Sequence, residues 1–136
     1  NNATKVATLD VDPVSGIGLP VTTGAPAQIA IIDSTAAKAA LVTVEDGANG
    51  AVINVTISNV IDPANAGKTF TLTAFESAYN AGASTARTAG TSWSETFSSA
   101  FAAGVNSMKI GASIKTNDVV YADGNYDGGF DLTFSY

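Results

Sequence analysis

The chain of 136 residues contains neither cysteine nor histidine. Without cysteine there are no disulfides, thiolate nucleophiles or thiolate metal ligands, and without histidine there is no Ser-His-Asp chemistry. No other base stands close in sequence to the abundant serine and threonine hydroxyls. We therefore expect no enzymatic activity and no cofactor.

Basic residues are also scarce, since 6 Lys and Arg stand against 12 Asp and Glu, for a net charge of −6. No basic patch is available for a nucleic-acid backbone or for an anionic membrane surface. No apolar run is long enough to insert into a membrane, and no basic segment precedes an apolar one at the start. We expect that any secretory signal has been cut away.

What the sequence does contain is a series of short segments with alternating apolar and polar residues, which is typical of strands. In the clearest of them, 51–61, we expect Ile53, Val55 and Ile57 to point inward. In 69–75 the alternation puts Phe70, Leu72 and Ala74 on one face. The expected strands are 2–12, 27–33, 40–46, 51–61, 69–75, 106–116 and the C-terminal segment, with a loop at 15–26 and turns at 46–50 and 62–68. This pattern predicts one all-β domain, a sandwich or a barrel.

The stretch 76–104 leaves two interpretations open. Trp93, Phe97 and Phe101 are spaced by four, which fits one face of a helix. The many Ser, Thr, Ala and Gly residues around them favour irregular strands or loop instead. We prefer the second interpretation.

One acidic motif lies near the C-terminus, where Asp123, Asn125 and Asp127 match the start of a calcium loop, D-x-[DN]-x-[DN]-G. Position twelve of such a loop requires a carboxylate, and here it is Phe134. The residues that follow alternate as in a strand rather than a helix. A turn before a final strand is the favoured interpretation, and a calcium site is the alternative.

Two further features could serve a site. Asp10 and Asp12 share a face of an extended strand, where they could bind a metal or exchange protons, or simply keep a strand edge soluble. Trp93 and the tyrosines could line a sugar site, although such residues belong more often to the core. In both cases the structural interpretation is favoured.

The two ends of the chain are the most informative. The first alternating strand stops at Pro13 and is followed by a Gly- and Pro-rich loop. We expect the last strand to run to Tyr136 and to have an edge that no later residues cover. If the first strand of one copy filled the edge of the next, the contact would be head-to-tail and would generate a filament.

Both ends also carry a family resemblance. The start VATLDVDPV (6–14) resembles the N-terminal donor strand of class 5 chaperone–usher pilins, in which an alternating strand ends in a V-D-P-V element. The end GNYDGGFDLTFSY (124–136) is similar to the closing strand of pilins, G-x-Y-x-G followed by alternating apolar residues. Together the two segments cover about a fifth of the chain.

The resemblance implies an immunoglobulin-like β-sandwich, residues 15–136, that lacks one strand and is completed by residues 1–14 of a neighbouring subunit. It implies a homopolymer on the cell surface, a pilus or fimbria in adhesion or biofilm formation, assembled with a periplasmic chaperone and an outer-membrane usher. The donor residues would be Ala7, Leu9 and Val11, and the groove strand would carry Phe130, Leu132, Phe134 and Tyr136. The alternative function is a monomeric β-sandwich module of a secreted or surface protein that binds calcium or carbohydrate.

Overall fold

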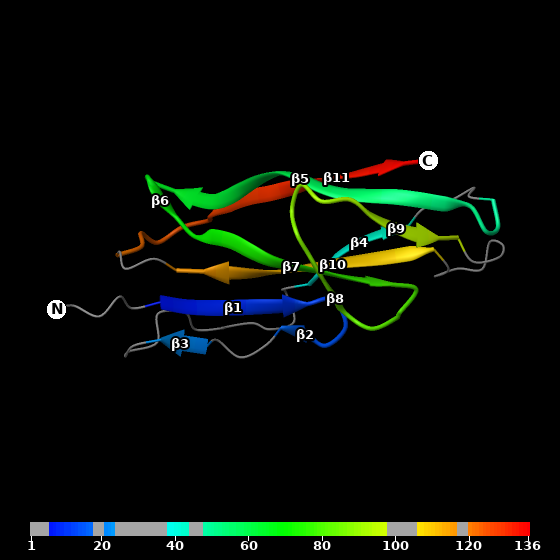
Figure 1. Ribbon diagram of the computed structural model, residues 1–136. Helices are drawn as coiled ribbons and strands as arrows, with labels where there is room; N and C mark the ends of the chain where they lie inside the picture. The colour runs from blue at the N-terminus through cyan, green and yellow to red at the C-terminus, as the bar shows by residue number, and fades with distance from the viewer. Residues whose placement is uncertain (1–5, 18–20, 24–37, 44–47, 98–105, 117–119) are drawn as a thin grey trace.

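The computed structural model describes residues 6–17, 21–23, 38–43, 48–97, 106–116 and 120–136, and they form two antiparallel β-sheets (Figure 1). The larger sheet consists of β1 (Val6–Asp12), β2 (Gly16–Ile17), β3 (Val21–Thr23), β4 (Ala40–Thr43), β7 (Thr71–Tyr79), β8 (Thr85–Arg87) and β10 (Ser107–Lys115). The smaller sheet consists of β5 (Val52–Asn65), β6 (Lys68–Thr69), β9 (Trp93–Thr96) and β11 (Asp127–Ser135). The all-β prediction is confirmed, and the two sheets are consistent with a sandwich. The described residues include no helix long and apolar enough to cross a membrane.

The larger sheet is built around β10. On one edge β10 pairs with β7 along its length, and β8 follows β7. On the other edge it pairs with β4 through residues 107–110 and with β1 through residues 112–115. The outer edge of β1 is occupied in turn by β2 and β3. In the smaller sheet, β5 carries β11 on one edge and β9 and β6 on the other.

The core lies between the two sheets and is centred on β5. The inward positions predicted for this strand, Ile53, Val55 and Ile57, are all buried, as the alternation requires. The other members of the buried cluster are Phe75, Phe97, Met108 and Ile110. These apolar side chains, contributed by both sheets, hold the sheets together through the hydrophobic effect.

Ala74 was predicted to share a face with Phe70 and Leu72, and this prediction is wrong because β7 contains a bulge. Residues 74 and 75 together oppose a single residue of β10, and Ala74 has a φ of 48°. Such an extra residue reverses the alternation beyond it. Ala74 is therefore exposed, and Phe75 takes the buried position.

The turn predicted at 62–68 is shorter than expected. β5 continues to Asn65, which pairs with Lys68, so that only Ala66 and Gly67 form the connection. Both have positive φ, 48° and 75°. This is the geometry of a two-residue type I′ hairpin, whose twist matches the twist of the flanking strands.

Two other expectations are corrected. The segment predicted as a loop at 15–26 contains the short strands β2 and β3, since backbone pairing with β1 overrides its Gly and Pro content. The alternative of a helix carrying Trp93, Phe97 and Phe101 is wrong for residues 93–96, which form the strand β9. Phe97 comes directly after this strand and is buried in the core. Phe101 and the strand predicted at 27–33 lie outside the described residues.

Two isoleucines of β5 test the role of this strand in the core. Ile57 is fully buried, whereas Ile61 is 64% exposed on the same strand. Ile57→Ala should lower the free energy of unfolding by about 2–5 kcal/mol, because it removes buried methyl groups and leaves a cavity. Ile61→Ala should change it by less than about 0.5 kcal/mol. Urea denaturation of both variants measures the difference, and equal losses would contradict this account of the core.

Candidate functional site

The most prominent candidate for a functional surface is the outer edge of β11. This strand pairs with β5 on its inner edge, and no strand of the described residues pairs with its outer edge (Figure 1). A strand of nine residues thus presents a row of backbone N–H and C=O groups to a potential partner strand.

The inward face of β11 is apolar and only partly covered. Leu132 and Phe134 stand opposite the buried Ile57 and Val55 of β5. The Phe130 ring meets the ring of Phe75 edge to face, with the centroids 5.2 Å apart. Phe130, Leu132 and Phe134 all pack against the core cluster, but each remains half-buried. An additional strand at this edge would therefore cover apolar surface as well as satisfy backbone groups.

Two irregularities fix the position of β11 against β5. The register shifts between Asp127 and Gly129 and again between Gly129 and Asp131. At Gly128 a Cβ would lie 2.6 Å from the Ile61 carbonyl oxygen, so a side chain has no room there. Asn59, with a φ of 47°, donates from Nδ2 to Asp131 Oδ2 at 2.7 Å. These contacts leave β11 little freedom to slide, and its outer edge has a defined register.

Four residues were predicted to lie on the strand beside a groove. Three of them, Phe130, Leu132 and Phe134, form the inner face of β11 and pack against the core cluster. Tyr136 lies just beyond the end of the strand and is 82% exposed.

The residues predicted to be inserted into a neighbour lie in the larger sheet of their own chain. Leu9 stands opposite Ile114, and Val11 stands opposite Ala112, in the ladder between β1 and β10. Both are half-buried, and neither belongs to the buried core cluster. Ala7 pairs with Thr22 of β3. The structure does not bring these residues together with β11, which belongs to the other sheet.

The aspartates of the first strand have structural partners. Ser113 donates its hydroxyl to Asp10 Oδ1 at 2.8 Å. Asp12 Oδ1 accepts hydrogen bonds from the backbone N–H groups of Val14 and Ser15, at 2.7 and 2.5 Å. These hydrogen bonds stabilise the charged carboxylate and lower the pKa of Asp12 to about 2, and the bond from Ser15 has the largest effect. The two carboxylates therefore fasten β1 and the turn that follows it.

The motif at 123–127 forms no carboxylate cluster in the described structure. Asp123 and Asn125 are exposed in the loop before β11, and Asp127 is the first residue of that strand. In the described part of the chain no three acidic side chains gather in a way that could hold a metal ion. The segment bends at Asp123 and Gly124 and leads directly into β11.

The segment before β11 is held by aromatic contacts. Phe70 stacks on Tyr121, with ring centroids 4.4 Å apart, and meets Tyr126 edge to face at 4.8 Å. The hydroxyl of Tyr121 donates to the Thr69 carbonyl oxygen. Tyr126, the tyrosine of the G-x-Y-x-G element, thus has a packing role that places the start of β11.

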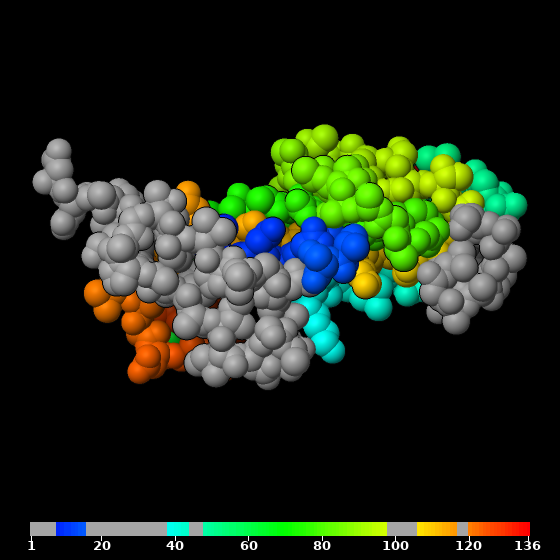
Figure 2. Space-filling model, turned by 90° about the horizontal axis from the view of Figure 1, so that it is seen from below, coloured from blue at the N-terminus to red at the C-terminus, as the bar shows by residue number. Residues whose placement is uncertain are grey.

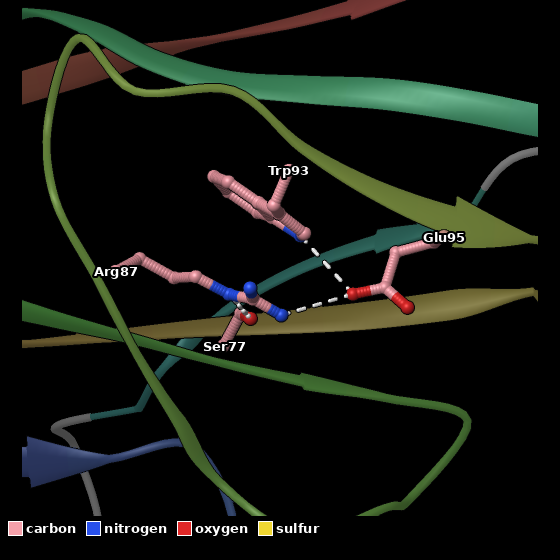
Figure 3. Close-up of polar contacts among 4 residues, drawn as sticks. All are labelled: Ser77, Arg87, Trp93 and Glu95. Carbon is pink, nitrogen blue, oxygen red and sulfur yellow. Dashed lines mark hydrogen bonds and ion pairs between the residues drawn. The ribbon is translucent and has the colours of Figure 1, made fainter.

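A polar cluster that the sequence analysis missed surrounds Trp93 (Figure 3). The Arg87 guanidinium lies over the indole ring, 4.6 Å from its centroid, and forms an ion pair of 3.1 Å with Glu95. Glu95 also accepts a hydrogen bond from the indole N–H at 3.0 Å. Arg87 Nε donates to the hydroxyl of the buried Ser77 at 2.7 Å. The spacing of these residues gives no periodic signal, which explains why sequence reasoning did not find them.

This cluster joins the two sheets at their other edge. Arg87 belongs to β8 of the larger sheet, while Trp93 and Glu95 belong to β9 of the smaller sheet. The Arg87 side chain covers one face of the indole, and Trp93 also packs against the core cluster. The arrangement joins the sheets on one side by an ion pair, whereas on the β11 side the described residues join them by apolar contacts such as that of Phe130 with Phe75.

Comparison of the chain with protein-family models, with curated proteins and with solved structures gives no match.

The pKa of Asp12 yields a pH-dependent prediction. Because the folded-state pKa of about 2 is below the ordinary value of 3.8, the charged carboxylate stabilises the fold fully above about pH 4. This contribution is lost as the pH falls through 2. Asp12→Ala should lower the free energy of unfolding by about 1 kcal/mol at neutral pH, because two hydrogen bonds are lost from a solvent-facing turn.

Urea denaturation between pH 2 and 7 measures the effect. The difference between wild type and Asp12→Ala should shrink as the pH falls from 4 toward 2. Asp12→Asn, which keeps an acceptor oxygen but no charge, should retain part of the stability. A difference that stays constant down to pH 2 would show that the charge of Asp12 does not stabilise the turn.

Proposed function

We propose that this chain is the structural subunit of an extracellular pilus or fimbria that polymerises by donor-strand exchange. The observation that carries the proposal is the outer edge of β11, which has no partner strand among the described residues although the chain's own first strand is present. In this proposal the fold is an immunoglobulin-like sandwich that lacks a strand at this edge. Residues 1–14 of a neighbouring copy supply it.

Strand addition at β11 would combine backbone and side-chain stabilisation. A donor of about ten residues spans roughly 33 Å. Its inward positions would be Ala7, Leu9 and Val11, at the same two-residue period as the inward side chains of β11. Burial contributes on the order of 2 kcal/mol for each of the two larger side chains, and each ladder hydrogen bond adds about 1 kcal/mol net.

The geometry of the two surfaces favours an open polymer. The inserted strand and the accepting edge are different surfaces, located in different sheets of the same chain. A contact between unlike surfaces is heterologous, and each added copy presents a fresh β11 edge. Dissociation would require a strand to leave a packed sandwich, so we expect the filament to be kinetically stable.

An unpaired apolar edge is also a hazard before assembly, because it can pair with any exposed strand. A periplasmic chaperone that lends a strand to β11 would protect the subunit, and an outer-membrane usher would bring two subunits together. These partners, the location on the cell surface and a role in adhesion or biofilm formation are part of the proposal. They rest on the resemblance of the two ends of the chain to pilins.

One observation favours a second candidate, a monomeric β-sandwich module of a secreted or surface protein that binds calcium or carbohydrate. β1 pairs with β10 in its own chain, as expected of a self-contained domain. A monomeric module would remain a single species at high concentration.

Cross-linking in a chain without native cysteine distinguishes the two candidates. Thr8 of β1 and Thr133 of β11 are replaced by cysteine on separate molecules, which are then mixed and oxidised. If β1 of one copy adds to β11 of another, the mixture should form a mixed disulfide between the two variants. Asp131→Cys and Ser135→Cys cover the neighbouring registers at a spacing of two residues. Thr85→Cys on β8, at the fastened edge, is the matched control and should give none.

Filaments should appear in wild-type protein by negative-stain microscopy and disappear when Leu9 is replaced by Asp, because a charge would enter the apolar edge. A protein that remains monomeric, with no mixed disulfide at any position of β11, would favour the binding module. Filaments that persist without residues 1–12 would exclude donor-strand exchange as their basis.

A further inference from the structure

We infer that the edge of β10 from 111 to 115 is a second, selective binding site for residues 8–13, which holds the first strand in the monomer and withholds it from β11 of a neighbour. The existence of this strand-binding site follows from the contacts described below. Its effect on assembly rests on the proposed function.

The first strand cannot serve both sites at once. Residues 8–11 pair with β10 on one edge, while residues 6–8 and 11–12 pair with β3 and β2 on the other. Both edges of β1 are therefore engaged within its own chain. Insertion beside the β11 edge of another copy requires β1 to leave this position, so the two sites compete for one segment.

Because Gly111 has no side chain, the backbone of β1 can approach β10 closely at this position. A Cβ at this position would overlap the Val11 carbonyl oxygen and would lie 2.9 Å from Cδ of Pro13. Pro13 is itself buried. The bulge of β7 lies opposite residues 111–113 on the other edge of β10. Any side chain at position 111 would push β1 away from β10.

A second contact recognises a particular side chain of β1. Ser113 is 6% exposed, and its hydroxyl donates to Asp10 Oδ1 at 2.8 Å. Asp12 then fixes the turn at Pro13 by accepting from the backbone N–H groups of Val14 and Ser15. The site thus distinguishes the sequence D-V-D-P from an arbitrary strand, through a carboxylate at position 10 and a turn that brings Pro13 against Gly111.

The same site holds the strand with little apolar burial. Leu9 and Val11 are half-buried and contribute nothing to the buried core cluster. Atoms of β1 and its turn reach the surface in the middle of the face seen from below (Figure 2). The attachment is thus specific in its polar and backbone contacts but modest in hydrophobic stabilisation, which allows release without loss of the β5-centred core.

Two substitutions should release the strand to different degrees. Gly111→Ala should increase amide hydrogen exchange at residues 8–11 by at least about tenfold, because the added methyl group collides with β1. Ser113→Ala should increase it about threefold through loss of one charge-assisted hydrogen bond. Ser94→Ala removes a cross-strand hydroxyl bond to Asn54 in the smaller sheet and should leave exchange in β1 unchanged. If exchange in β1 is the same in all three variants and wild type, the site is not selective.

Assembly should follow the same order. The lag before filaments scatter light should shorten several-fold in Gly111→Ala and less in Ser113→Ala, with Ser94→Ala behaving as wild type.

A reversible disulfide between β1 and β10 tests the converse, that a strand held on β10 prevents assembly, without destabilising the fold. Thr8 and Lys115 stand directly opposite in the ladder, so the pair Thr8→Cys and Lys115→Cys should form the only disulfide in the protein. The oxidised variant should not assemble, and a reductant should restore assembly.

The outcomes separate this inference from the proposed function. A lag in Gly111→Ala equal to that of wild type, although hydrogen exchange in β1 is increased, would overturn the withholding role and leave donor-strand exchange intact. Assembly of the oxidised, locked variant at the wild-type rate would overturn donor-strand exchange by the first strand as well, because the locked strand cannot leave β10. If no variant assembles, but hydrogen exchange in β1 responds as expected, the strand-binding site on β10 stands. In that case the proposed function and the withholding role are both overturned.

Discussion

The antiparallel ladder between β5 and β11 is the interaction on which the rest of the molecule depends. β5 supplies three of the buried side chains, and through its pairing it places the half-buried side chains of β11 against the same core. The two bulges in this ladder, with Gly128 and the Asn59–Asp131 hydrogen bond, fix which residues of β11 face inward. That fixed register also determines which backbone groups of β11 lie on its outer edge.

The two sides of the molecule differ in how the sheets are joined. At β8 and β9, the Arg87 side chain bridges the sheets through an ion pair, an indole face and a buried serine hydroxyl. At β11, the described residues provide apolar side chains but no second strand. In the proposed assembly, an added strand at β11 would form its contacts at the periphery and leave this core undisturbed.

The first strand has a dual character that a linear pattern does not show. Its alternation suits insertion at an apolar edge, yet in the monomer it is held by Gly111 and Ser113 of β10. The contacts that hold it are backbone approach and polar recognition rather than deep burial. In the proposed assembly, this modest apolar burial would favour release of the strand to a neighbour.

Much of the fold could be predicted from the sequence because strand alternation is a local property. The inward residues of β5, the apolar face of β11 and the strand nature of β10 follow from period-two patterns, and the absence of histidine and cysteine restricts the available chemistry. The reversal at Ala74, the pairing of β2 and β3 with β1, and the Arg87–Trp93–Glu95 cluster could not be predicted, because each depends on partners distant in sequence. Which edge receives β1, and which edge has no partner strand among the described residues, is likewise decided only by tertiary structure. Alternation states which face of a strand is apolar, but it carries no information about the neighbour that will satisfy the backbone groups at its edge.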